Sequence, residues 1–116
     1  MRQKKKRILT GDRPTGSLHL GHYVGSLANR IKLQSEFESF IIIADVQALT
    51  THWEKEDYLA RDVFQITTDY IAAGLDPEQS TIFLQSRIPE IHELTMYYAM
   101  FTPVNVLRHN PTIKTE

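Results

Sequence analysis

The stretch "FIIIA", residues 40–44, is an unbroken apolar run with three consecutive β-branched isoleucines. A strand with one face in water alternates apolar and polar side chains, whereas a strand covered on both faces in a parallel sheet is apolar throughout. The run therefore predicts a strand of a parallel sheet. Because parallel strands are joined by crossovers of a dozen or more residues, usually helices, strands and helices should alternate along the chain.

The segment before this strand fits that alternation. Residues 8–10, "ILT", continue from Arg7 as a short strand, which the turn formers Gly11 and Asp12 are expected to close. Apolar residues at helical spacing then predict a helix over residues 20–34. They are Leu20, Val24, Leu27 and Ile31.

The segment after the strand continues the pattern. An apolar stripe predicts a second helix over residues 58–73, which ends at Gly74 because glycine commonly terminates helices. Residues 81–85, "TIFLQ", are typical of a third strand. A third helix is predicted over residues 89–101, since Pro89 is favourable in a first helical turn.

This order of elements predicts a doubly wound α/β fold of the Rossmann type, with a parallel sheet, right-handed crossovers and helices on both faces. Residues 1–6 are interpreted as a basic tail and residues 7–116 as one unit. The stretch 102–116 is polar, contains two prolines and is expected to hold neither a strand nor a helix. Since three strands leave an exposed edge, we expect residues 7–116 to be the first half of a larger nucleotide-binding domain.

Composition excludes several classes of protein. Apolar residues make up 41% and charged residues 23% of the sequence, which argues against a disordered or fibrous chain. The absence of cysteine removes disulfides and thiolate nucleophiles. The net charge of −1 provides no field that attracts a polyanion. Because no apolar run is long enough for a membrane span or a signal peptide, the expected location is the cytoplasm, with no membrane partner.

The segment "RPTGSLHLGH", residues 13–22, leads from the first strand into the first helix. In open α/β sheets, ligands bind beyond the carboxyl ends of the strands, and phosphates bind at helix N-termini. Gly11 and Gly16 allow a positive φ or a close approach of the backbone, and Pro14 stiffens the loop between them. The segment therefore predicts a phosphate-binding loop.

Two glycines and two histidines lie near the start of the helix. Gly21 and Gly25 leave its surface without side chains, so that an adenine ring could lie against the backbone. His19 and His22 are three residues apart, which places their Cβ atoms about 5–6 Å apart on one helical face, where both could donate to one triphosphate. Two alternatives stay open: a metal pair, although no third ligand follows at a useful distance, and a merely structural helix start.

The string "HLGH", residues 19–22, resembles the HIGH signature of the class I aminoacyl-tRNA synthetases. The longer strings "TGDRPTGSLHLGHYVGSL" and "NPTIKTE" are similar to the tryptophanyl-tRNA synthetase family within that class, and the resemblance extends from Arg7 to Glu116. Tyrosyl-type synthetases and small-molecule nucleotidylyltransferases, which use a similar H-x-G-H, are the alternatives within the superfamily.

The resemblance implies a two-step reaction. ATP, with Mg²⁺, activates L-tryptophan to tryptophanyl-adenylate, and the acyl group then moves to tRNA(Trp). It also implies a homodimer, and a second, lysine-rich signature and a helical domain beyond Glu116. An RNA-binding adaptor that uses the basic tail is the non-enzymatic alternative.

Site residues follow from the resemblance by position. The residues implied to bind ATP are Arg13, Pro14, Thr15, Gly21 and His22. The residues implied to act on the phosphates during the reaction are His19, His22 and Lys114. No protein-bound metal is expected.

The amino-acid pocket is expected at the strand ends. The candidate residues there are Leu9, Gly11, Asp45, Gln47 and Gln85. Asp45 can equally cap a turn after its strand. Gln85 and Ser86 can likewise be ordinary polar groups at the end of a strand.

Overall fold

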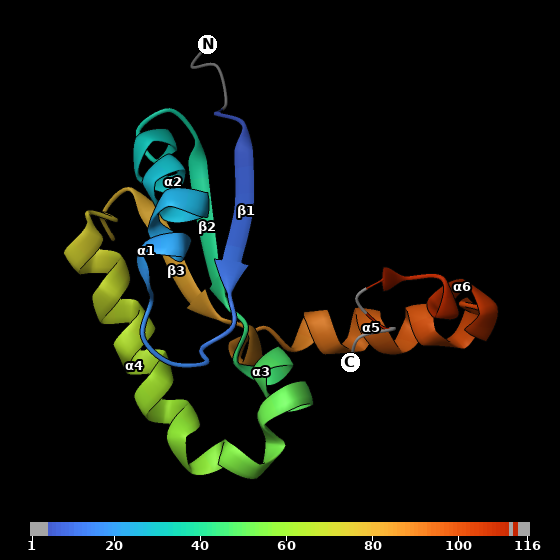
Figure 1. The fold of residues 1–116 in the computed structure, drawn as a ribbon. Helices are drawn as coiled ribbons and strands as arrows, with labels where there is room; N and C mark the ends of the chain where they lie inside the picture. The colour runs from blue at the N-terminus through green and yellow to red at the C-terminus, as the bar shows by residue number, and fades with distance from the viewer. Residues whose placement is uncertain (1–4, 112, 114–116) are drawn as a thin grey trace.

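The computed structural model describes residues 5–111 and 113, with only the backbone for residues 55–57. Three parallel strands form one sheet in the order β1-β2-β3 (Figure 1). They are β1 (Arg7–Asp12), β2 (Glu38–Ile43) and β3 (Ser80–Leu84). Gly11 pairs with Ile42, and Ile41 pairs with Ile82. The parallel α/β architecture predicted from the sequence is confirmed.

Helical crossovers join the strands. Between β1 and β2, one continuous helix consists of α1 (Leu20–His22), a π-helical turn (Tyr23–Leu27) and α2 (Ala28–Leu33). The segment between β2 and β3 consists of α3 (Asp45–His52), a 3₁₀ turn (Trp53–Lys55) and α4 (Glu56–Ala73). After β3 come a 3₁₀ turn (Gln85–Arg87), α5 (Pro89–Phe101) and α6 (Val104–Arg108). Helix α5 extends away from the sheet (Figure 1).

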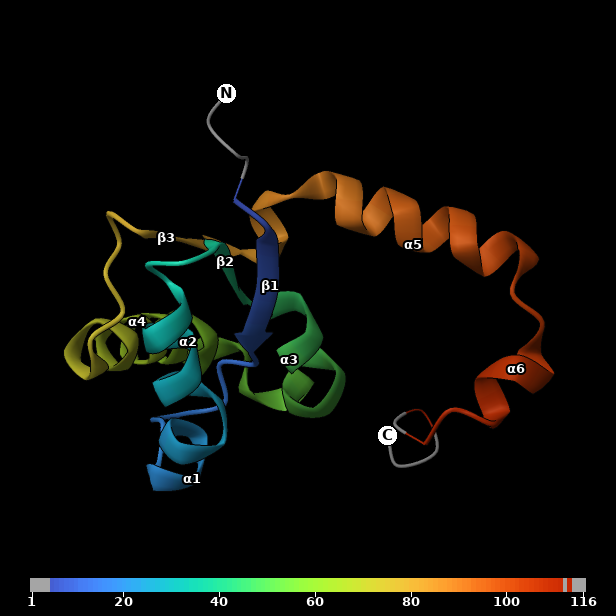
Figure 2. The ribbon, with the colours of Figure 1, turned by 90° about the horizontal axis from the view of Figure 1, so that it is seen from above.

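The helices α2 and α4 cover the same face of the sheet (Figure 2). The buried core lies between them and the sheet and consists of Leu27, Ile41, Ile43, Ile66, Tyr70 and Leu75. Right-handed crossovers that advance in one direction place successive helices on one side. This arrangement is that of one half of a doubly wound domain, before the strand order reverses.

The opposite face of the sheet is more open. Leu9 on β1 is 68% exposed, and Phe40 and Ile42 on β2 are only half-buried, whereas Ile41 and Ile43 are buried. Within the described residues, the expected helical cover of both faces is therefore present on one face only.

The main differences from the sequence-based expectations are the end of one strand and two additional helices. Strand β1 continues through Gly11 and Asp12, the residues expected to close it. Residues 45–52 form helix α3, which the sequence did not predict because only Asp45 and Ala48 are buried in it. Helix α6 corrects the expectation that residues 102–116 contain no helix.

The ends of the longer helices agree with their sequence signals. Helix α4 ends immediately before Gly74, whose φ of 112° is accessible to glycine at little cost. Helix α5 begins at Pro89 and ends at Phe101, as expected. Within the part of the chain that the structure describes, no helix combines the length and the apolar character needed to cross a bilayer.

Candidate nucleotide-binding site

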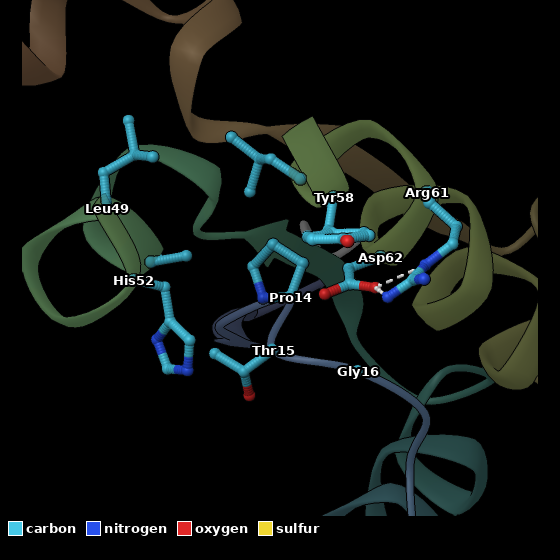
Figure 3. Close-up of a pocket in the computed structure, with 10 residues that line it drawn as sticks. Pro14, Thr15, Gly16, Leu49, His52, Tyr58, Arg61 and Asp62 are labelled. Atoms are coloured by element: carbon cyan, nitrogen blue, oxygen red, sulfur yellow. Dashed lines mark hydrogen bonds and ion pairs between the residues drawn. The ribbon is translucent and has the colours of Figure 1, made fainter. Parts of the chain in front are cut away.

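The loop between β1 and α1 is held by side chains of the later helices. Gly16 has a φ of 119°, so the positive φ considered for this glycine is present. Pro14 is buried and lies between α3 and α4 (Figure 3). The Leu18 N–H donates to Asp69 Oδ2 at 2.8 Å, and Gln65 Nε2 donates to Oδ1 of the same carboxylate at 2.8 Å. Helix α4 therefore fixes the point at which the loop enters α1.

His19 and His22 cap the first helix reciprocally. His19 Nδ1 accepts from the Gly21 N–H at 3.1 Å, and His22 Nδ1 accepts from the His19 N–H at 3.2 Å. The centroids of the two rings are 3.9 Å apart, with the planes inclined by 44°. The two side chains are neighbours at the helix start, as their spacing predicted.

These contacts decide which nitrogen of each ring donates. A ring nitrogen that accepts a hydrogen bond carries no proton, so each neutral imidazole has its proton on Nε2. Two adjacent rings with Nε2–H donors suit an anionic ligand, because hydrogen bonds to a charged acceptor are stronger than those between neutral groups. The caps thus serve the helix and leave Nε2–H as the donor of each neutral ring.

The glycines at the start of the helix differ in their surroundings. A Cβ at Gly21 would lie 2.9 Å from His19 Cε1, so the capping imidazole would have to shift to accommodate a side chain there. A Cβ at Gly25 would meet nothing within 4 Å. Both residues are exposed, and the adenine contact suggested for this surface stays a prediction.

A cavity of about 410 Å³ opens at the carboxyl ends of β1 and β2. It is lined by Gly11, Asp12, Arg13, Thr15, His22, Ile42, Ala44 and Gln47. Among these are five residues that the sequence assigned to the ATP and amino-acid sites, namely Gly11, Arg13, Thr15, His22 and Gln47. Arg13 also donates from Nη1 to Thr51 Oγ1 on α3 at 3.4 Å. Residues from three separate segments therefore meet in one cavity.

A second cavity, of about 390 Å³, lies against the same loop (Figure 3). The loop residues Pro14, Thr15 and Gly16 form one wall, and side chains of α3 and α4 form the rest. On α4, Arg61 lies over the Tyr58 ring at 4.7 Å and pairs with its neighbouring aspartate. Thr15 lines both cavities, so the loop contributes to the wall of each.

The remaining residues expected at the amino-acid pocket lie outside the lining of the first cavity. Leu9 is on the open face of the sheet. Asp45 is buried, and its Oδ1 accepts from the Ser86 N–H at 3.0 Å. Gln85 Oε1 accepts from the Gln47 N–H at 3.1 Å. These contacts join the start of α3 to the turn after β3. They fit the alternative in which Asp45 and Gln85 are structural polar groups at the ends of their strands.

Lys114, expected to reach the phosphates, lies outside the described residues. In the described ranges 5–111 and 113, no group of three or more His, Cys, Asp or Glu side chains is arranged to hold a metal ion.

Sequence reasoning missed a buried ionic cluster next to the cavity, formed by Asp12, Arg30 and Tyr70. Arg30 Nη1 and the Tyr70 hydroxyl both donate to Asp12 Oδ2 at 2.6 Å. Burial acts to raise the pKa of Asp12, but the hydrogen bonds from Arg30 and Tyr70 and the charge of Arg30 outweigh it, so the pKa is lowered. Burial and the hydrogen bond to Asp12 raise the pKa of Tyr70. The carboxylate is therefore charged and the phenol neutral at pH 7.

The lowered pKa of Asp12 predicts an acid-dependent loss of stability. A carboxyl group whose pKa is lower in the folded state contributes stability above its unfolded pKa, about 3.9 for aspartate, and loses it as the pH falls through the folded value. The free energy of unfolding, from urea titrations between pH 7 and pH 2.5, should therefore fall less steeply below about pH 4 in Asp12→Asn than in the wild type. Equal slopes would show that Asp12 has no such linkage.

The parallel sheet, and the histidine-capped helix that follows its first strand, define an α/β domain of the Rossmann type with an H-x-G-H sequence at the start of its first helix. Comparison with known proteins identifies the family. The family model of the class I tRNA synthetases (W and Y) matches residues 1–115. A tryptophan–tRNA ligase of Lactococcus lactis is 55% identical over 114 residues, which cover 97% of this chain and 33% of that protein.

Comparison with solved structures supports the same family. The crystal structure of tryptophanyl-tRNA synthetase from Campylobacter jejuni superposes with a TM-score of 0.86 and 29% identity, over 97% of this chain and 35% of the other. The structure of that enzyme complexed with ADP and tryptophan gives a TM-score of 0.82 and 31% identity, over 89% of this chain and 32% of the other. The chain belongs to the class I tRNA synthetases of the W and Y type. It spans about a third of the length of the curated relatives it matches.

Proposed function

We propose that residues 7–116 are the N-terminal part of the catalytic domain of a tryptophan–tRNA ligase and supply its ATP site. The observation that carries this proposal is the pair of capping histidines, 3.9 Å apart, next to a cavity at the carboxyl end of β1. The name of the Lactococcus lactis relative and the ADP and tryptophan in the Campylobacter jejuni complex support tryptophan as the amino acid.

In the first step, the tryptophan carboxylate attacks the α-phosphorus of ATP. A new O–P bond forms, the bond between the α-phosphorus and the bridging oxygen breaks, and pyrophosphate leaves with the electron pair. No protein nucleophile is needed, so the rate depends on aligning the reactants and stabilising charge on the phosphate oxygens. The Nε2–H groups of His19 and His22 and the guanidinium of Arg13 are the donors proposed for that charge.

The remaining assignments follow the same proposal. Pro14 and Thr15 shape the loop against ATP, Gly21 backs the adenine, and Lys114 reaches toward the pyrophosphate. ATP enters as its Mg²⁺ complex. A hydroxyl oxygen of the terminal ribose of tRNA(Trp) then attacks the acyl carbon of the adenylate; the hydroxyl loses its proton, and AMP leaves with the electron pair. This step is proposed to take place in the cytoplasm.

The amino-acid site is proposed beside the ATP site. Gly11 and Gln47 line the cavity directly. Leu9 lies on the same strand as Gly11, and Gln85 contacts the backbone of Gln47. Asp45 is proposed to act at the rim through the turn that it fixes.

A homodimer is part of the proposal. Helix α5 carries large apolar side chains that are half or more exposed, including Met96, Tyr97, Met100 and Phe101. A contiguous apolar surface of this kind is typical of an interface.

Light scattering of the full-length protein should give twice the chain mass, and Met100→Asp should lower the measured mass. A monomer in both cases would contradict the dimer.

The proposed activity is tested by exchange of labelled pyrophosphate into ATP, using the full-length protein. Exchange is expected with tryptophan and ATP·Mg²⁺, but neither with tyrosine nor without an amino acid. Exchange that requires tyrosine would assign the tyrosyl activity instead. No exchange with either amino acid would refute the synthetase proposal.

A further inference from the structure

We propose that Asp12, Arg30 and Tyr70 form a buried positioning network that sets the distance between the end of β1 and the histidine-capped helix, and hence the alignment of ATP. This inference rests on the proposed function and concerns residues that do not themselves belong to the H-x-G-H motif.

The network joins three segments around the site. Arg30, on α2, donates to both carboxylate oxygens of Asp12, at 2.6 Å and 3.2 Å, and to the Gly11 carbonyl at 3.3 Å. Tyr70, on α4, donates to the same carboxylate at 2.6 Å. Helix α4 also holds the loop, because Asp69 accepts from the Leu18 N–H. The strand, the first helix and α4 are thus locked to one another.

Burying the ion pair of Asp12 and Arg30 costs free energy, because both charges lose contact with water. Arg30 is 6% exposed and Tyr70 is fully buried. Arg30 Nε is buried without a hydrogen-bond partner. Buried ion pairs often add no more stability than well-packed apolar side chains of similar volume, whereas a bidentate contact between an arginine and a carboxylate adds geometric specificity. The cluster is therefore better explained by the position it enforces than by the stability it adds.

That position bears directly on the proposed chemistry. Asp12 lies between Gly11 and Arg13 and lines the cavity together with His22. Arg30 lies about two turns after His22 on the continuous helix. The bidentate contact between Asp12 and Arg30 therefore fixes how far Arg13 stands from the two imidazoles. Since a displacement of about 1 Å can cost about 100-fold in rate, loosening this contact should slow the chemical step.

The test replaces the whole network with apolar side chains in the full-length protein. The variant Asp12→Leu/Arg30→Met/Tyr70→Phe leaves no unpaired buried charge, so it should keep a thermal midpoint close to that of the wild type. We expect kcat for tryptophan-dependent pyrophosphate exchange to fall about tenfold or more, while KM for tryptophan stays within a factor of two. A purely structural role would leave both constants unchanged once stability is retained.

A matched control lies on the same strand. Arg7 Nε pairs with Glu38 at 2.7 Å at the opposite end of β1, where both side chains are exposed. Arg7→Met/Glu38→Leu should leave kcat and KM unchanged. If the triple variant does not fold, Tyr70→Phe alone, which keeps the ion pair, should still lower kcat without raising KM for tryptophan.

The possible outcomes distinguish a failure of the proposed network from a failure of the proposed function. The network role alone would be overturned if the wild type catalyses exchange and a folded triple variant keeps an undiminished kcat. If the triple variant does not fold, an undiminished kcat in Tyr70→Phe has the same meaning. A fall of kcat in the control pair equal to that in the network variant would also overturn the network role. No exchange by the wild type would overturn the proposed function, and the network role with it.

Discussion

Replacing His22 with alanine should lower kcat for adenylate formation by about 10²–10³-fold, the range seen when one donor to transition-state charge is lost. The Nε2–H of His22 is proposed to bind phosphate oxygens as their charge redistributes, so its loss acts on the transition state. Because His22 is proposed to contact the phosphates and not the amino acid, KM for tryptophan should change little. Pre-steady-state measurement of adenylate formation by the full-length protein gives both values.

His22 also caps the helix, so its replacement has a structural cost. Loss of a side-chain cap lowers stability by about 1 kcal/mol, and the assay temperature must lie well below the unfolding midpoint of the variant. His92→Ala is the matched control, because His92 is exposed on α5 and should leave both constants unchanged. An equal rise in KM for tryptophan in His22→Ala would contradict a role confined to the phosphates.

Gly11→Ala should destabilise the fold by about 3 kcal/mol, the upper end of the range for overpacked sites. A Cβ at this position would lie 1.9 Å from the Ile42 carbonyl oxygen and 2.4 Å from Ile42 Cγ2. The oxygen belongs to the neighbouring strand, so the overlap can be relieved only by shifting β1 against β2. Chemical denaturation of the variant and the wild type gives the difference directly.

Gly25→Ala is the control for this prediction. A Cβ there meets nothing within 4 Å, and alanine is preferred over glycine inside a helix by up to about 1 kcal/mol. The variant should therefore be as stable as the wild type or slightly more stable. Equal losses of stability at Gly11 and Gly25 would show that the close approach of the strands is not what requires glycine.

Single residues with strong conformational preferences predicted the helix ends at which they lie. The ends of α4 and α5 follow from Gly74 and Pro89, because the conformational preferences of glycine and proline act on their own residue. Helix α3 has no such signal: it is short, and buries only two of its residues. Helix α6 was missed because two prolines in its stretch suggested irregular structure.

Residues of the candidate site likewise fall into those that a local pattern predicts and those that depend on contacts between distant segments. The histidine pair could be predicted because it depends on a spacing of three residues within one helix. Arg30 and Tyr70 are separated from Asp12 by 18 and 58 residues, so no local pattern connects them, and Tyr70 looks like an ordinary member of an apolar stripe. Asp45 and Gln85 were identifiable as polar residues at strand ends, but their pairing across the chain depends on the packed sheet.

A crystal structure of the full-length protein with ATP and the unreactive analogue tryptophanamide locates the nucleotide relative to the histidine-capped helix. We predict phosphate oxygens within about 2.7–3.2 Å of Nε2 of His19 and His22, with the adenine against Gly21. A triphosphate in the second cavity, which the Pro14–Gly16 loop lines together with α3 and α4, or one that touches neither imidazole, would contradict the assignment.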